Sequence, residues 1–160
     1  MEKILAGMNP ASASYWAGLH ALSLAKRIDA QVCFLYVSKS GSTGNPSRWT
    51  DREAASDFRA RVDHLVEQAR EEGISVQYYV SEGNYEGELV RFVHDKKITI
   101  LVLGAPDGHG TGIARFGNFV DRIRHRVDCR IEVVHEKAFT GNPKRKEKID
   151  VAHVSTHRRQ

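Results

Sequence analysis

Residues 99–117 read TILVLGAPDGHGTGIARFG, and this stretch decides the predicted fold. Its first five residues are apolar or β-branched, which is typical of a strand buried on both faces. Four glycines follow between positions 104 and 112, and glycine tolerates positive φ and lets a ligand approach the backbone closely. Asn118 is the predicted N-cap of a helix, whose apolar residues recur at helical spacing: Phe119, Val120, Ile123 and Val127.

A buried strand, a glycine-rich loop and a helix N-terminus together predict an anion site. The free N–H groups and the positive end of the helix dipole both attract a negative ligand. Glycines in such number are equally typical of a loop that only connects two elements. The stretch alone therefore leaves a ligand-binding loop and a purely structural loop as alternatives.

Apolar runs alternate with helical patterns along the rest of the chain. The predicted strands are residues 3–8, 31–37, 74–80, 99–103 and 130–135. This alternation forces right-handed crossovers, so we expect an α/β fold: a five-stranded parallel sheet with helices on both faces. Ligands of such sheets bind beyond the carboxyl ends of the strands, where the strand order reverses. The loops after the first and fourth strands are the predicted walls of a site.

The positive charge of the chain lies at its C-terminal end. From Ala138 onward there are six basic and two acidic residues, which matches the net charge of +4 of the whole chain. The 18 basic and 18 acidic residues that remain leave residues 1–137 neutral, so composition does not predict a nucleic-acid-binding body. We expect one domain over residues 1–137 and a flexible basic tail over residues 138–160.

Motifs for membrane insertion, metal binding and catalysis are lacking in the sequence. No apolar run reaches the roughly 20 residues of a membrane helix, and the N-terminus leads straight into a strand, so we expect a cytoplasmic protein. Cys33 and Cys129 sit in apolar runs as reduced core thiols, and no pair has metal-ligand spacing. The loop has no P-loop lysine, nucleophile–base pair or carboxylate pair, so an enzyme such as a slow ATPase ranks third among the predicted functions.

Several segments resemble the universal stress protein family. They are NPAS at residues 9–12, LAKR at 24–27, FLYV at 34–37, EGN at 82–84 and the loop at 104–118. The resemblance covers about residues 3–136 and leaves the tail outside. It implies a Rossmann-like nucleotide-binding sheet and a homodimer joined through the last strand, residues 130–135. It also implies, for some members, bound ATP.

The resemblance implies a nucleotide site that departs from the family pattern at three positions. ATP-binding members carry a glycine, two residues, a second glycine, nine residues, then glycine with serine or threonine. Gly104 and Gly117 match the first and third glycines, Asp107 stands at the second, and Asn118 replaces the hydroxyl residue. Asn9 stands where the family often has an acidic residue near the adenosine. The implied nucleotide-binding residues are Asn9, Val37, Leu103, Gly104, Asp107, Gly108, Gly110, Gly117 and Asn118.

Asp107 is the departure with the largest electrostatic effect. A carboxylate near a phosphate is repelled by about 1 kcal/mol at 4 Å in water, and by more where water is excluded. Arg115 or a protonated His109 would offset this charge, and Mg²⁺ between Asp107 and the phosphate is a further alternative. Asn118 retains the ability to cap a helix and to donate a hydrogen bond.

The leading predicted function is a regulatory stress-response domain that binds ATP or AMP and signals through dimer or protein-partner contacts. The alternative is a nucleotide-free dimeric adaptor with a structural loop. In either case we expect neither a specific nucleic-acid partner nor membrane insertion. Glu132 is unusual in the apolar run of the last strand. We expect residues 130–135 to be an edge strand, in which Glu132 either blunts the edge against aggregation or faces a cation across a two-fold axis, for which Arg130 is the nearest candidate.

Overall fold

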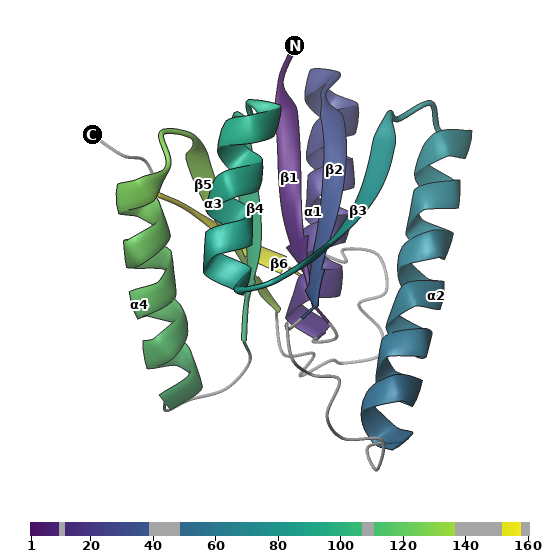
Figure 1. The fold of residues 1–160 in the computed structure, drawn as a ribbon. Coiled ribbons are helices and arrows are strands. Elements are labelled where there is room, and N and C mark those ends of the chain that lie inside the picture. The colour runs from purple at the N-terminus through teal and green to yellow at the C-terminus, as the bar shows by residue number, and fades with distance from the viewer. Residues whose placement is uncertain (10–11, 39–48, 107–110, 137–151, 158–160) are drawn as a thin grey trace, which may run out of the picture.

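A computed structural model of the chain describes residues 1–9, 12–38, 49–106, 111–136 and 152–157 (Figure 1). Helices and strands alternate as the apolar pattern predicts. The elements are β1 (Lys3–Met8), α1 (Ser12–Ile28), β2 (Gln31–Ser38), α2 (Trp49–Glu71), β3 (Val76–Glu82), α3 (Tyr85–Lys96), β4 (Ile100–Ala105), α4 (Thr111–Arg126), β5 (Arg130–Glu136) and β6 (Ala152–His157).

The strands form one sheet in the order β3-β2-β1-β4-β5-β6. The first five are parallel to one another, which confirms the predicted parallel sheet and its α/β class. The chain first runs outward from β1 to β2 and β3 and then returns to the other side of β1 to form β4. The strand order thus reverses between β1 and β4, which places the expected ligand position at their carboxyl ends.

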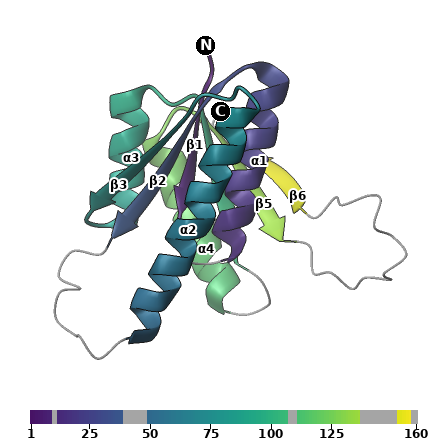
Figure 2. The ribbon, with the colours of Figure 1, turned by 90° about the vertical axis from the view of Figure 1, so that its right-hand side faces the viewer.

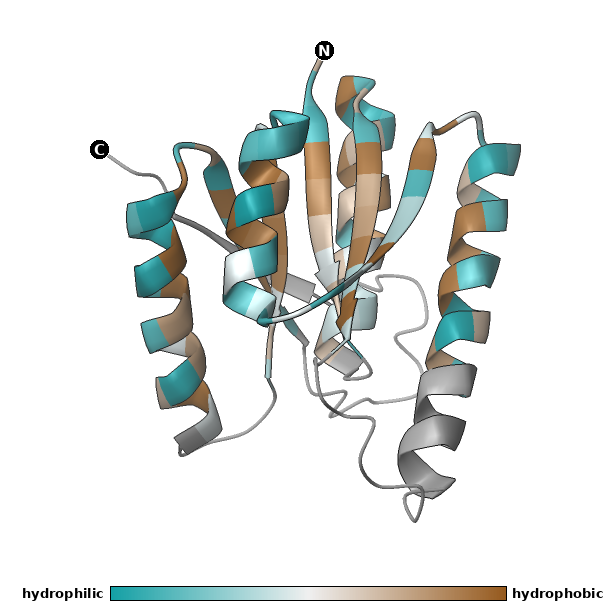
Figure 3. Ribbon diagram, viewed as in Figure 1, coloured by the Kyte–Doolittle hydropathy of each residue, from teal (hydrophilic) through white to brown (hydrophobic). Residues whose placement is uncertain are grey.

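The two faces of the sheet are covered by different helices. Along β1, Ile4, Ala6 and Met8 pack into the core under α1 and α2, whereas Leu5 packs into the core under α3 and α4. This division follows from the two-residue period of a strand. Figure 2 shows α1 and α3 on opposite sides of the strands, and Figure 3 shows apolar residues along the strands and on the inward sides of the helices.

The outer edge of β5 is covered by β6, so the prediction that residues 130–135 form an edge strand is wrong. β6 pairs antiparallel with β5, with Ile131 opposite His157 and Glu136 opposite Ala152. An uncovered strand edge presents a row of unpaired N–H and C=O groups, and β6 pairs with them. The sequence signal for β6 is weak because AHVSTH at 152–157 has few apolar residues. Part of the expected flexible tail is therefore a strand of the sheet.

Glu132 of β5 is buried, with only 4% of its surface exposed. Its Oε1 lies 3.4 Å from His20 Nε2 and 3.4 Å from an Arg130 side-chain nitrogen. The hydrogen bond with His20 is the main influence that holds the pKa of Glu132 below its ordinary value. Arg130, the cation expected from the sequence, thus contacts Glu132 within the same chain. The acidic residue in this apolar run is explained by contacts with its own chain.

Helix α4 begins at Thr111, so the prediction that Asn118 caps it is wrong. Asn118 lies in the middle of the helix on its exposed side. The additional turns bring Phe116 onto the same side as Phe119, and their ring centroids lie 6.2 Å apart. Burying part of this aromatic pair compensates for two helical glycines, Gly112 and Gly117, which each cost about 0.5–1 kcal/mol relative to alanine.

We expect Gly117→Ala to raise the free energy of unfolding by about 0.5–1 kcal/mol. A Cβ built at Gly117 meets no atom within 4 Å, and its φ is not positive. Alanine therefore fits without strain and removes the entropic cost of a helical glycine. Urea denaturation followed by circular dichroism measures the change. A lower stability than that of the wild type would show that α4 does not extend through this position.

Candidate functional site

A cavity of about 410 Å³ lies at the carboxyl ends of β1 and β4, where the strand order reverses. Its volume falls within the range of about 300–1,000 Å³ that is typical of small-ligand sites. The cavity opens on the side of the sheet that α3 and α4 cover. Its lining residues are Gly7, Asn9, Ala13, Ser14, Tyr85, Leu103, Gly104, Pro106, Arg115, Phe116, Phe119 and Arg122.

Tyr85 reaches into this cavity because Gly7 leaves room for it. A Cβ at Gly7 would overlap the hydroxyl oxygen of Tyr85. Asn84 fixes the start of α3, since its side-chain oxygen accepts a 2.9 Å hydrogen bond from the backbone N–H of Gly87. Burial raises the pKa of Tyr85 far above its ordinary value, so the hydroxyl stays protonated at neutral pH. It is a hydrogen-bond donor in the wall of the cavity.

Gly104 meets the start of α1 at the cavity, which Ala13 and Ser14 also line. It lies in β4, opposite Val134 of β5, and is not the first residue of a loop as predicted. A Cβ at Gly104 would overlap the backbone carbonyl of Ala13 and lie 3.0 Å from the backbone nitrogen of Ser14. The backbone of α1 thus occupies the space that a side chain at position 104 would need. Glycine is therefore required here for a structural reason.

Ser14 joins the start of α1 to the end of β1. Its Oγ accepts a 2.8 Å hydrogen bond from the backbone N–H of Asn9 and donates a 3.2 Å bond to the carbonyl of Gly7. Only 3% of Ser14 is exposed. These bonds hold the end of β1, with Asn9, in one position at the edge of the cavity. Ser14 is consequently a structural residue of the site.

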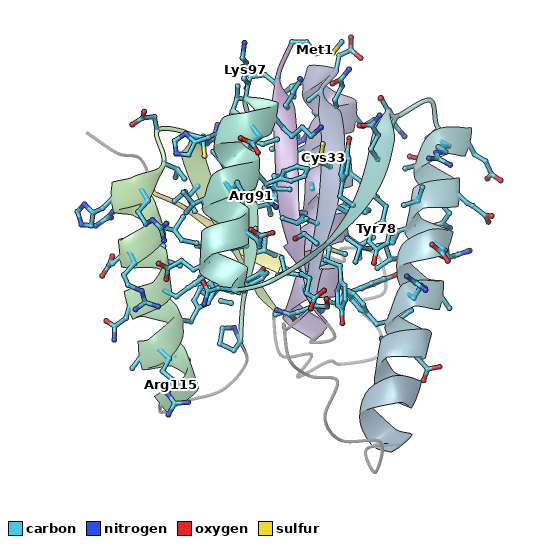
Figure 4. All side chains as sticks on the ribbon, in the orientation of Figure 1. Met1, Cys33, Tyr78, Arg91, Lys97 and Arg115 are labelled. Atoms are coloured by element: carbon cyan, nitrogen blue, oxygen red, sulfur yellow. The ribbon has the colours of Figure 1, made fainter. Side chains whose placement is uncertain are left out.

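Helix α4 contributes an aromatic wall with an arginine at each end. Arg115, Phe116, Phe119 and Arg122 follow at helical spacing on the side that lines the cavity. Tyr85 of α3 continues the wall, with its ring centroid 5.5 Å from that of Phe119. In Figure 4, Arg115 lies at the end of α4 toward which the carboxyl ends of the strands point.

The two arginines of the wall have different surroundings. Arg122 Nε lies 2.7 Å from Glu86 Oε1, and Arg126 lies 2.9 Å from the other oxygen of the same carboxylate. Hydrogen bonding to Arg122, and secondarily to Arg126, lowers the pKa of Glu86. Arg115 is exposed and makes no ion pair within the part of the chain that the structure describes. The described lining residues include these two arginines and no carboxylate, and of the two Arg115 makes no ion pair with a described residue.

The structure brings together three of the nine residues that the sequence predicts to bind a nucleotide. Asn9, Leu103 and Gly104 line the cavity. Val37 packs against the core under α3 and α4 and is not among the described lining residues. Gly117 and Asn118 are exposed on α4 and do not line the cavity either. The remaining three predicted residues lie outside the described residues: Asp107, Gly108 and Gly110.

The aromatic residues of the wall were missed as site residues by sequence reasoning. Phe116 stood in the predicted loop, and Tyr85 stood at the start of a helix that was not assigned to the site. Arg115 was expected only to offset the charge of Asp107. A predicted helix that begins before residue 115 would have revealed them, because the spacing of four residues then places them on one helix face: Arg115, Phe116, Phe119 and Arg122.

The described part of the chain has neither a cluster of metal-ligating side chains nor a helix that could span a membrane. No group of three or more metal-ligating side chains occurs among those residues. None of the helices, as far as their residues are described, is both long and apolar enough to cross a bilayer. Cys33 and Cys129 are buried free thiols, and burial raises the pKa of both, that of Cys129 to about 11. They belong to the core, as the sequence predicts.

A profile of the universal stress protein family matches residues 1–135 of this sequence. The chain belongs to the universal stress protein family. The match covers all of β1 to α4 and most of β5, and therefore every described residue that lines the cavity. A universal stress protein of Methanocaldococcus jannaschii, MJ0531, is 25% identical over 138 residues, which are 83% of this chain and 81% of the relative.

Solved universal stress protein structures share the fold. A universal stress protein in complex with cAMP superposes with a TM-score of 0.61 at 15% identity, over 84% of this chain and 97% of that one. A family member from Arabidopsis thaliana with AMP bound gives a TM-score of 0.60 at 14% identity, over 88% and 95% of the two chains. At such low identity the likeness supports the universal stress protein fold and nothing finer.

Proposed function

We propose that this universal stress protein binds an adenine nucleotide, AMP or ATP, in the cavity at the carboxyl ends of β1 and β4. The observation that carries the proposal is the cavity wall, which combines three aromatic rings with two arginines and has no described carboxylate. Aromatic rings offer stacking surfaces to a base, and guanidinium groups bind phosphate. Two solved relatives are described as complexes with cAMP and AMP.

The proposed role is regulatory, with no catalytic step. A regulatory ligand acts by favouring one of two conformations that a partner surface distinguishes. Helix α4 is suited to transmit such a signal, because it lines the cavity with one side and exposes His125 on another. The partner in this proposal is a protein, and the proposed location is the cytoplasm.

Titration calorimetry with AMP, ATP and GMP, each with and without Mg²⁺, tests the proposed function. We expect AMP or ATP to bind with a dissociation constant in the micromolar range, and GMP to bind more weakly. The ultraviolet spectrum of the freshly purified protein shows in addition whether a nucleotide travels with it. Absence of binding by every nucleotide, with no nucleotide carried through purification, would contradict the proposal.

Asp107→Gly is expected to tighten nucleotide binding about tenfold, equivalent to roughly 1.4 kcal/mol. Position 107 lies outside the described residues, so this expectation rests on charge alone: the change removes an anion close in sequence to the cavity residue Pro106. Calorimetry with AMP and ATP measures it. If the wild type binds only with Mg²⁺ and the variant binds less well, Asp107 is a metal ligand instead.

A nucleotide-free adaptor domain is the second candidate function. Gly104 and Gly117 match the family's nucleotide pattern, yet the former is required by the backbone of Ala13 and the latter lies on an exposed helix face. Both glycines thus have places in the fold that need no ligand. The calorimetric result for the wild type separates the two candidates, since an adaptor of this kind binds no nucleotide.

A further inference from the structure

We propose that Arg115 of α4 is the group that holds the phosphate of the bound nucleotide, while the aromatic wall of Phe116, Phe119 and Tyr85 receives the base. This inference rests on the proposed function and goes further, because it assigns the phosphate to a side chain. The family resemblance instead implied the backbone of the glycine-rich loop. The inference follows from the charges, spacing and exposure of the residues that line the cavity.

The arginines around the cavity differ in whether they are already held in ion pairs. Arg122 and Arg126 are both held by Glu86, at 2.7 and 2.9 Å. Arg124 lies 3.4 Å from Asp121. Arg115 lines the cavity and makes no ion pair with any described residue. A phosphate can therefore bind Arg115 without separating an existing pair, and a guanidinium offers two parallel N–H donors to phosphate oxygens.

The aromatic rings of the wall lie beside Arg115. Phe116 and Phe119 follow it directly on α4, and Tyr85 lies beside Phe119 with 5.5 Å between their ring centroids. The rings are partly buried, whereas Arg115 is exposed. A flat apolar base is thus accommodated against the rings, and the charged phosphate at the solvent-facing end of the wall. This orientation keeps the charged phosphate away from the partly buried rings.

Two residues that the family pattern assigns to the nucleotide site lie away from the cavity. Gly117 and Asn118 lie within α4, after its first turn, and face away from the cavity lining. The backbone N–H groups in the middle of a helix are already bonded within the helix and are not free for a ligand. Gly117 and Asn118 therefore offer no free backbone donor to a phosphate, whereas Arg115 is a cation of the described wall that makes no ion pair with a described residue.

Comparing AMP with adenosine tests the inference, because the two ligands differ only in the phosphate. Calorimetry is carried out on the wild type, on Arg115→Ala and on Arg124→Ala. The last is the matched control, since it removes a partly exposed arginine of the same helix that is not among the described residues lining the cavity. We expect Arg115→Ala to weaken AMP binding at least tenfold and to leave adenosine binding within twofold of the wild type. Arg124→Ala should resemble the wild type for both ligands.

Other results would contradict either the role of Arg115 alone or nucleotide binding as a whole. If the wild type binds AMP and Arg115→Ala binds it equally well, the phosphate lies elsewhere, and the proposed function stands without this inference. Equal losses in Arg115→Ala and Arg124→Ala would indicate a general charge effect and would also overturn it. If the wild type binds neither AMP nor adenosine, the proposed function fails and the inference fails with it. Equal urea midpoints for the three proteins confirm that a loss is not due to unfolding.

Discussion

Replacing Gly104 with alanine is expected to lower the free energy of unfolding by about 2–3 kcal/mol. The new Cβ would overlap the carbonyl group of Ala13 and press against the backbone nitrogen of Ser14, so the start of α1 must move away from β4. Backbone cannot rotate aside as a long side chain can, and forcing extra atoms into a packed site typically costs 1–3 kcal/mol. The movement would also strain the hydrogen bonds from Ser14 to the end of β1.

Urea denaturation of Gly104→Ala beside Gly117→Ala measures this effect with a matched control. Both variants add one methyl group to a glycine of the family pattern, yet we expect opposite signs. Gly117→Ala has open space around the new Cβ and is expected to be more stable than the wild type. If Gly104→Ala unfolds at the same urea concentration as the wild type, the packing of α1 against β4 is looser than the structure indicates. The fold would then not require glycine at position 104, and ligand binding would be the remaining explanation for it.

Removing residues 137–160 is expected to increase self-association of the domain at least tenfold. The truncation deletes β6 and leaves unpaired N–H and C=O groups along the outer edge of β5, over the six residues from Ile131 to Glu136 that β6 pairs with. Such an edge is a template for pairing with a strand of another chain. The family resemblance implies a dimer through this strand, and in the full chain a second copy would have to displace β6 before it could pair there.

Light scattering and sedimentation at tens of micromolar compare the truncated chain with the full chain. A second truncation that removes only residues 158–160 is the control, since it shortens the tail but retains β6. We expect the control to behave as the full chain does and the longer truncation to shift toward a dimer. Equal masses for all three proteins would show that covering β5 is not what limits its pairing with another copy.

The sequence by itself determined the order of the elements and the class of the sheet. Apolar runs such as residues 31–37 have the length and composition of buried strands, and the stripe formed by Val120, Ile123 and Val127 has the period of a helix. These are local signals, because each depends on residues that are close together in the chain. Alternation of strand and helix then restricted the connections to right-handed crossovers, and so the parallel sheet was predicted correctly.

The sequence also indicated the end of the sheet at which a site should lie, although not most of its residues. The loops after the first and fourth strands were predicted as its walls because the carboxyl ends of neighbouring parallel strands meet at one edge. The family resemblance, and not this argument, named the three predicted residues that line the cavity: Asn9, Leu103 and Gly104. Tyr85 and Phe119 are 34 positions apart in the sequence, yet their rings are in contact. Nothing in the local pattern of either residue indicates the other.

Only the tertiary structure decided where α4 begins, why Gly104 is a glycine and what covers β5. The start of α4 depends on whether packing Phe116 and Phe119 against the core under α3 and α4, with Tyr85 beside Phe119, outweighs the cost of two helical glycines, and that packing exists only when the helix lies on the sheet. Gly104 is set by the distant backbone of Ala13, and β6 by the unpaired edge of β5. In each case the energy comes from groups far apart in the chain, whereas glycine content, periodicity and caps report only on neighbours.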